Sequence, residues 1–270
     1  MSDKPSQPGS SSQQNAALVR GERHGSVGVV IIDRPARRNA LNLEVKNALA
    51  QQLREFDQDP SIACVVLTGA GGCFVAGSDI VEMSDMRPTD HVRQDTDRIF
   101  HILRTLAKPA VAAVEGYALG GGCELALACD IIIAGEGATF GQPEIKIGIM
   151  PGGGGTQRLL RSAGKYKTLL WSLTGERIPA QAAYHANMVS ELVPDGQALD
   201  RALAIAKQIA AMPPLAVRAI REAVRMGADA SLETGLALER RAFERLFDSD
   251  DQKEGMRAFI DKRAPVFKGS

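Results

Sequence analysis

The chain has 270 residues, and its 32 lysine and arginine residues balance its 32 aspartate and glutamate residues. This length allows one large hydrophobic core with a smaller unit attached to it. The balanced charge excludes a global positive field, so we expect neither nucleic acid nor an anionic membrane as a partner. No run of about 18 apolar residues occurs, which argues against a membrane-spanning helix.

The cysteines and the N-terminus predict an intracellular protein. The four cysteines (Cys64, Cys73, Cys123 and Cys129) lack the paired spacings of a zinc site, so we expect reduced thiols and no bound metal. The N-terminus lacks the charged segment and apolar stretch of a secretory signal. We therefore expect a cytoplasmic location, and a processed organellar precursor remains an open alternative.

The first half of the chain alternates predicted strands and helices. Residues 1–15 are mostly Ser, Gln, Pro and Gly, which predicts a disordered tail over 1–16. A strand is expected from Val27, followed by an amphipathic helix over about 43–56. The apolar run 64–69 predicts a short strand that is buried on both faces.

The same alternation continues through the middle of the chain. Helical spacing over 91–107 predicts a helix, and Pro109 then marks the entry to a strand over 110–114. A glycine run precedes a segment of good helix formers that holds Glu124, so the glycines are expected to open a helix. Two further strands, separated by a glycine turn, are expected at the positions 131–134 and 138–140.

From about Thr156 the pattern is nearly all helical, and Asp250 is the expected cap of the last helix. The expected C-terminal helices cover residues 179–186, 199–211, 214–226, 232–247 and 252–263. Strands that alternate with helices and end in polar loops place the chain in the α/β class. We divide it into a core with the site over 17–195 and a helical C-terminal region over 196–270.

Two glutamates in glycine-rich surroundings are the candidate catalytic groups. Glu124 follows Gly120, Gly121 and Gly122 and lies in the first turn of its helix, where free N–H groups and the helix dipole favour a carboxylate. Glu144 lies near several isoleucines, which are expected to desolvate it and raise its pKa toward neutrality. One charged and one protonated carboxyl beside N–H donors would suit base, acid and oxyanion chemistry.

Two other site classes receive less support. No glycine loop contains the Gly-Lys-Ser or Gly-Lys-Thr of a phosphate loop, and none matches the dinucleotide fingerprint. A nucleophilic Ser78 is an alternative, but the Gly-x-Ser-x-Gly of a hydrolase is incomplete. His24, His91, His101 and His185 form no triad signature, and we expect them to be surface or core residues.

Five motifs together resemble the crotonase superfamily, specifically enoyl-CoA hydratases. They are Phe-Val-Ala-Gly-Ser-Asp-Ile at 74–80, Gly-Tyr-Ala-Leu-Gly-Gly-Gly-Cys-Glu-Leu-Ala at 116–126, Phe-Gly-Gln-Pro-Glu at 140–144, Pro-Gly-Gly-Gly-Gly-Thr-Gln-Arg at 151–158 and Glu-Gly-Met-Arg-Ala-Phe-Ile-Asp-Lys-Arg at 254–263. The resemblance covers about residues 19–268. It implies a spiral of ββα units and a helical C-terminal region used for trimerisation, with trimers often pairing into hexamers.

The resemblance also implies roles for individual residues. Glu124 and Glu144 occupy the positions of the two hydratase acids. The backbone N–H groups of Ser78 and Gly121 occupy the positions of the oxyanion hole. Coenzyme A is part of the substrate and no separate cofactor is implied. The implied contacts to it are Ala40, Ala76, Asp79, Ile80 and Lys262.

The implied reaction is reversible syn addition of water to a trans-2-enoyl-CoA, which gives a 3-hydroxyacyl-CoA, as in fatty-acid β-oxidation or a related acyl-CoA pathway. The chain would thus be a carbon–oxygen lyase. Ser78 replaces the usual alanine, and Val81 stands where many hydratases carry a phosphate-binding lysine, so we expect other basic residues to bind the CoA phosphates. A double-bond isomerase, another acyl-CoA enzyme of the superfamily and a non-catalytic CoA- or RNA-binding protein are the alternatives.

Overall fold

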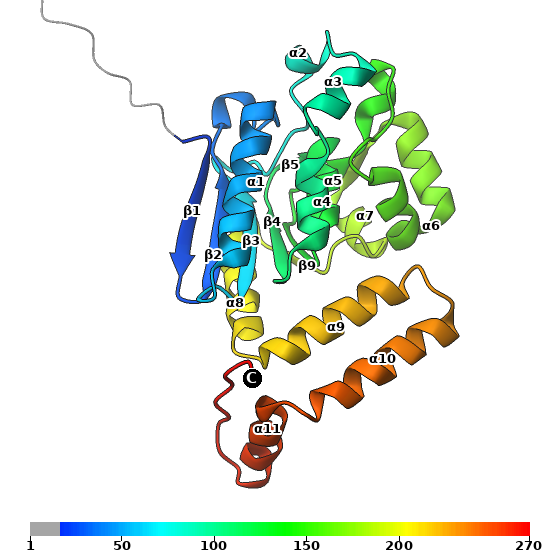
Figure 1. The fold of residues 1–270 in the computed structure, drawn as a ribbon. Coiled ribbons are helices and arrows are strands. Elements are labelled where there is room, and N and C mark those ends of the chain that lie inside the picture. Colours follow the sequence, from blue (N-terminus) through cyan, green and yellow to red (C-terminus); the bar gives the residue numbers. More distant parts are fainter. Residues whose placement is uncertain (1–16) are drawn as a thin grey trace, which may run out of the picture.

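A six-stranded, mostly parallel sheet forms the centre of the computed structural model, which describes residues 17–270 (Figure 1). Its strand order is β1-β2-β3-β4-β6-β9, and only the edge pair β1–β2 is antiparallel. These strands are β1 (Val19–His24), β2 (Val27–Ile32), β3 (Cys64–Gly69), β4 (Ala110–Val114), β6 (Ile131–Gly135) and β9 (Glu191–Val193). The α/β class is therefore confirmed.

The central strands are apolar throughout because both faces of the sheet are covered. In β3, Val65 and Leu67 belong to the main core, whereas Cys64 and Val66 face a second core on the other side. Helix α1 (Leu43–Gln58) packs within the main core, and α8 (Ala198–Ala210) covers the opposite face. Burying a strand on both faces removes the need for polar positions along it.

A smaller three-stranded sheet carries the segments that lead into the site. Its order is β5 (Tyr117–Leu119), β7 (Thr139–Gly141) and β8 (Arg177–Pro179). The remaining helices are α2 (Ile80–Met83), α3 (Pro88–Arg93), α4 (Arg98–Thr105), α5 (Gly121–Ala128), α6 (Gly155–Thr174), α7 (Ala180–His185), α9 (Pro214–Gly227), α10 (Leu232–Leu246) and α11 (Asp250–Ile260), with short 3-10 helices at Pro35–Arg37 and Pro143–Ile147. The strand β5 runs directly into α5, which places the predicted glycine loop at the end of a strand.

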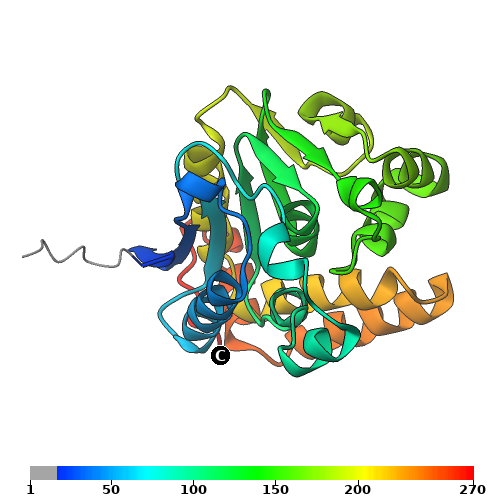
Figure 2. The same ribbon diagram turned by 90° about the horizontal axis from the view of Figure 1, so that it is seen from above.

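The C-terminal helices form an arm at one end of the molecule. In Figure 1 the antiparallel pair α9–α10 lies below the body, and in both Figure 1 and Figure 2 it extends toward the side that carries α6. Neither α9 nor α10 contains a buried residue. Large apolar side chains on the arm, among them Ile220, Leu232 and Phe259, are more than half exposed. The arm therefore presents apolar surface that the single chain does not cover.

The expected helix over 91–107 is wrong, because the segment is broken into α3 and α4. Asp95 has a φ of 48°, in the left-handed region that an α-helix cannot contain. The first half also lacks apolar packing, since Val92 is 83% exposed, whereas Ile99 and Leu103 of α4 are buried. Counting Val92 as part of the apolar stripe produced the error.

The region after Thr156 is nearly all helical, as expected, and only the short strands β8 and β9 interrupt the series of helices. The last helix is capped by Ser249, whose hydroxyl accepts from the Gln252 N–H at 3.2 Å, and not by Asp250. Asp250 is the first residue inside the helix. The predicted tail over 1–16 lies outside the described residues.

Across residues 17–270, no single helix is long and apolar enough to cross a bilayer. The helices α8 and α9 meet that criterion only when taken together, and they are bent by 112°.

Candidate active site

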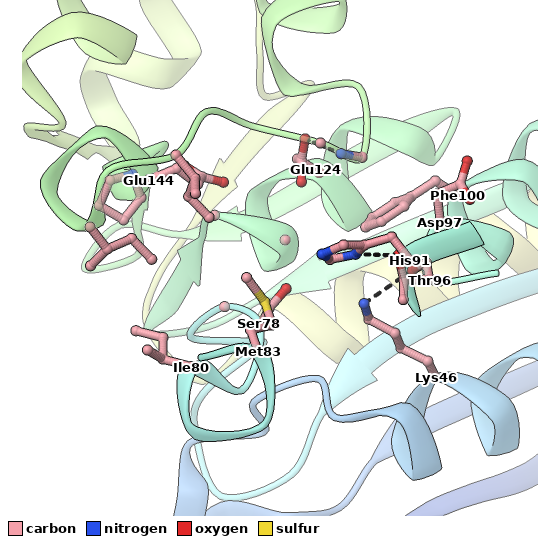
Figure 3. A pocket seen from close by; sticks show the side chains of 18 of the residues that line it. Lys46, Ser78, Ile80, Met83, His91, Thr96, Asp97, Phe100, Glu124 and Glu144 are labelled. Atoms are coloured by element: carbon pink, nitrogen blue, oxygen red, sulfur yellow. Dashed lines mark hydrogen bonds between the residues drawn. The ribbon is translucent and has the colours of Figure 1, made fainter. Parts of the chain in front are cut away.

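Both candidate acids line one cavity of about 600 Å³ (Figure 3). The helix α5 carries Glu124, and the 3-10 helix after β7 carries Glu144. The walls come from α1, the loop before α2, the α3–α4 segment and the glycine-rich turn before α6. Segments that are distant in sequence therefore converge on one space.

The Glu124 carboxyl is buried and held by the turn before α6. Its Oε1 accepts hydrogen bonds from the backbone N–H groups of Gly153 at 2.7 Å and Gly155 at 2.8 Å. These bonds, together with Arg158 and Lys46, favour the charged form, but burial outweighs them and raises the pKa of Glu124. The start of α5 therefore does not hold this carboxyl in its charged form as strongly as expected.

Burial also raises the pKa of Glu144, from 4.5 to about 7, and the nearby charge of Glu124 adds to the effect. The direction agrees with the expectation from sequence. The expected cause needs correction, because Ile145, Ile147 and Ile149 are each more than 40% exposed and are not core residues. The carboxyl is desolvated by its place in the cavity wall.

Two neighbours of Glu144 define its position. The side chain of Gln142 is completely buried, and with its amide nitrogen turned toward Glu144 it donates to the two carboxyl oxygens at 3.0 and 3.2 Å. Gly120 has a φ of 49°, and a Cβ there would lie 3.1 Å from Glu144 Oε1. The absence of a side chain at Gly120 thus gives the carboxyl its space.

Two backbone N–H groups in the cavity wall have no acceptor among the described residues. Ser78 forms an isolated parallel bridge with Leu41. The two hydrogen bonds of this bridge run from the Leu41 N–H to the Gly77 carbonyl and from the Asp79 N–H to the Leu41 carbonyl. The N–H of Ser78 itself therefore stays free. Gly121 is the first residue of α5, where the N–H has no intrahelical partner. A Cβ on Gly121 would lie 3.7 Å from the nitrogen of Ser78, so the two backbones approach closely.

Comparison with known proteins identifies the family. The family model described as enoyl-CoA hydratase/isomerase matches residues 22–270. The chain belongs to this family. The expectation of a crotonase-type fold and family is thereby confirmed, together with an enzyme of the enoyl-CoA hydratase kind.

Individual relatives of the enoyl-CoA hydratase/isomerase family cover nearly the whole chain. A probable enoyl-CoA hydratase of Mycobacterium bovis is 45% identical over 91% of this chain and 96% of its own. The 2,3-dehydroadipyl-CoA hydratase of Escherichia coli is 44% identical over 92% of this chain and 97% of its own. The solved enoyl-CoA hydratase of Bacillus anthracis is 36% identical, with a TM-score of 0.89 over 94% of this chain and all of its own.

The CoA contacts expected from the family divide into three groups. Ala76 and Ile80 line the cavity. Asp79 lies beside it and forms an ion pair with Arg34 at 2.7 Å, and Arg34 also donates to the Ala40 carbonyl at 3.1 Å. Lys262, which follows α11, lines neither described cavity.

A second cavity of about 240 Å³ contains basic side chains around Val81, the position at which the resemblance implied a phosphate-binding lysine. Val81 is 76% exposed and offers no charge. Arg34 and Arg37 line this cavity, and Asp79 and Glu82 face them. The basic residues near Val81 are therefore arginines of the segment that follows β2.

Sequence reasoning missed one wall of the cavity in this family member. Lys46, His91, Thr96 and Phe100 contribute to it (Figure 3). The one available signal was Lys46, a cation four residues before the buried Ala50 on the apolar face of α1. Because residues four apart lie on the same face of a helix, this spacing could have predicted that Lys46 points inward.

The hydrolase alternative receives no support from the geometry. Ser78 forms no side-chain hydrogen bond to a histidine within the part of the chain that the structure describes. His91 lines the same cavity, but its Nδ1 lies 3.1 Å from the Thr96 hydroxyl. In residues 17–270 no group of three His, Cys, Asp or Glu side chains could hold a metal ion.

Proposed function

We propose that this chain hydrates trans-2-enoyl-CoA thioesters to 3-hydroxyacyl-CoA by syn addition of water. The observation that carries the proposal is the convergence of two carboxyls of raised pKa with two free backbone N–H groups in one cavity. The hydratase names of relatives at 44–45% identity support it. Those names leave the acyl group open, because the Escherichia coli relative is named for a particular thioester and the Mycobacterium bovis relative is not.

The N–H groups of Ser78 and Gly121 bind the thioester oxygen. Donation of two hydrogen bonds stabilises the enolate-like charge that develops when water attacks the β-carbon. A typical loss on removing one such donor is about 100- to 1,000-fold in kcat. Ser78 contributes its backbone, and its hydroxyl lies beside Gly121, since a Cβ on Gly121 would lie 2.9 Å from Ser78 Oγ.

The two acids divide the proton transfers. Glu124 is held through Oε1 by two N–H groups, which leaves Oε2 to accept a proton from the attacking water. Glu144, with a pKa near 7, holds a proton that it delivers to the α-carbon. Both carboxyls also position the water, so protein groups alone perform the chemistry and no separate cofactor or metal takes part.

The CoA phosphates bind outside the main cavity. Arg34 and Arg37 take the role of the lysine that is missing at position 81, because both line the small cavity together with Val81. Ala40, Ala76 and Ile80 contact the rest of the CoA moiety. Lys262 serves this purpose only from a second copy, since in its own chain it lines neither cavity.

The active form is a trimer, alone or paired into a hexamer, and it resides in the cytoplasm. Exposed apolar side chains on α9, α10 and α11 support assembly, because contiguous exposed apolar surface marks interaction sites. Sedimentation analysis tests the assembly. A monomer at micromolar concentration would contradict it.

Hydration is tested with purified protein and crotonyl-CoA. Loss of the conjugated-thioester absorbance is expected, and its persistence across several acyl lengths would contradict the proposal. A double-bond isomerase is the alternative, since isomerisation can use one acid. Incubation with a 3-enoyl-CoA separates the two, because an isomerase produces the conjugated absorbance that a hydratase removes.

A further inference from the structure

The ammonium of Lys46 lies at the wall of the main cavity, on α1 (Figure 3). The side chain is half-buried, and its Nζ donates to the Thr96 carbonyl at 3.0 Å. Burial lowers the pKa of Lys46 even though the carboxylates of Glu82, Glu124 and Asp97 act in the opposite direction. The charge of the Lys46 ammonium is therefore desolvated without an ion-pair partner among residues 17–270.

An ammonium group has three donors, and only one of those of Lys46 is used. Among residues 17–270 it forms one hydrogen bond and no ion pair. Leaving a buried charged donor unpaired is costly. The two remaining donors thus require acceptors from the cavity, either water or a ligand.

Lys108 provides an internal comparison. Burial lowers the pKa of Lys108 as well, and its side chain is also half-buried. Its ammonium, however, donates to two backbone carbonyls, those of Phe56 and Asp59, at the end of α1. Lys108 serves the fold, whereas Lys46 keeps donor capacity beside the cavity.

A second polar group lies next to Lys46. Thr96 accepts from Lys46 through its carbonyl, and its hydroxyl lies 3.1 Å from His91 Nδ1. When this hydroxyl donates to Nδ1, the proton of the neutral ring resides on Nε2. His91 lines the cavity, so Nε2 is then a second donor in the same wall.

The position of this wall assigns it to the acyl group. In Figure 3, Ile80, an expected CoA contact, and Lys46 lie on opposite sides of Ser78. A thioester oxygen at Ser78 would therefore direct the acyl chain toward Lys46. The adjoining side chains Met83 and Phe100 are apolar and suit the methylenes of such a chain.

We propose that Lys46, with His91 as a second donor, selects enoyl-CoA substrates whose acyl chain ends in a carboxylate. This inference rests on the proposed hydratase function and specifies its substrate class. A terminal carboxylate supplies the acceptors that the ammonium lacks, and a charge-assisted hydrogen bond forms. A terminal methyl group leaves the ammonium unpaired.

Another role for Lys46 would be to favour the charged form of Glu124, whose pKa it helps to lower. That role would affect every substrate equally, because Glu124 acts on the shared enoyl group. Substrate pairs therefore distinguish recognition from an effect on the acid.

The test compares six-carbon and eight-carbon trans-2-enoyl-CoA thioesters that end in either a methyl or a carboxylate group. We expect the wild type to prefer the carboxylate at one length or both. Lys46→Met should lower kcat/KM for that thioester about 10- to 100-fold, the range for a hydrogen bond to a charged group, and leave the methyl-ended thioester within about threefold. Lys108→Met, the matched control, should leave the preference unchanged.

The outcomes are distinct. Hydration of crotonyl-CoA without a carboxylate preference at either length, or an equal loss of both thioesters in Lys46→Met, overturns the inference and leaves the hydratase proposal standing. Absence of hydration of every thioester contradicts both. If Lys46→Met does not fold, Lys46→Gln gives the same comparison. The absence of a carboxylate preference in the wild type would overturn the inference without any variant.

Discussion

The carboxyl of Glu124 and the backbone N–H of Gly153 form a hydrogen bond of 2.7 Å that links α5 to the turn before α6. The same oxygen accepts from Gly155 at 2.8 Å. One oxygen of the acid thus links two elements of the fold, and the other has no hydrogen-bond partner among the described residues. The two halves of the carboxyl have different tasks.

Replacing Glu124 with glutamine should remove the base and keep the structural oxygen. We expect Glu124→Gln to lower kcat for crotonyl-CoA about 100- to 10,000-fold with KM changed little, because general base catalysis contributes on that scale. The matched control is Glu115→Gln, since Glu115 Oε1 also accepts from two backbone N–H groups, those of Gly196 and Ala198, outside the cavity. A kcat for Glu124→Gln equal to that of the control would contradict the assignment.

Hydration should decline as the pH rises through about 7, because Glu144 is the proposed acid and burial raises its pKa to about 7. Glu144→Gln should lower kcat more than it weakens thioester binding. The pH profile of kcat, measured with saturating thioester, checks the first expectation. A profile that stays level from pH 6 to 9 would show that no acid of this pKa controls the step.

The same carboxyl should make stability depend on pH. The folded pKa of Glu144 lies above its usual 4.5, so the folded state holds a proton that the unfolded state releases, and stability falls as the pH rises from about 4.5 to 7. Glu144→Gln removes this penalty, so its Tm relative to the wild type should be higher at pH 8 than at pH 5.

Glu254→Gln serves as the control for that measurement. Arg263 lowers the pKa of Glu254 to about 2, so its contribution is present above about 4.5 and is lost only as the pH falls toward 2. The Tm difference of this variant should be the same at pH 5 and pH 8. A Glu144→Gln difference that is equally constant would refute the raised pKa.

Gly122 should not tolerate even a methyl group. A Cβ there would overlap the Val75 carbonyl oxygen, so we expect Gly122→Ala to lower the free energy of unfolding by about 1–3 kcal/mol or more. Gly227→Ala is the control, because its Cβ would meet nothing closer than 3.9 Å and alanine favours a helix by about 1 kcal/mol. Denaturant unfolding measures both, and equal effects would contradict the close approach of β5–α5 to Val75.

Arg221 should hold the arm to the body. Its side chain is 10% exposed, pairs with Asp130 at 2.8 Å and also donates to the Leu106 carbonyl. Arg221→Met removes this ion pair and the hydrogen bond to the Leu106 carbonyl together, so it should speed hydrogen exchange in α9 and α10. Arg240→Met, which breaks an exposed pair with Glu244 on the same arm, should not, since such pairs contribute less than about 1 kcal/mol.

Sequence reasoning succeeded where local chemistry determines the result. The strand at Cys64–Gly69 was predicted with its observed bounds, because an apolar run buried on both faces is distinctive. The motifs around Glu124 and Glu144 likewise combine acids with glycines in one short stretch each. Their convergence on a single cavity followed from the family resemblance and agrees with the structure.

Sequence reasoning failed where the structure depends on packing between segments that are distant in the chain. Lys46 and Thr96 are 50 residues apart, and nothing local to either indicates that one donates to the other. The edge strand β1 was missed because its residues are mostly exposed and therefore show no apolar alternation. The break at Asp95 depends on a left-handed residue that apolar spacing cannot reveal.

The broken α3–α4 segment has a consequence for how this enzyme can diverge. The acids and the free N–H groups lie on α5, a 3-10 helix and the loop before α2, whereas His91 and Thr96 lie on a largely exposed segment. Substitutions over 88–97 can therefore alter this wall of the cavity while the two acids and the free N–H groups stay in place. One wall of the cavity and the two acids are thus carried by parts of the chain that can change independently.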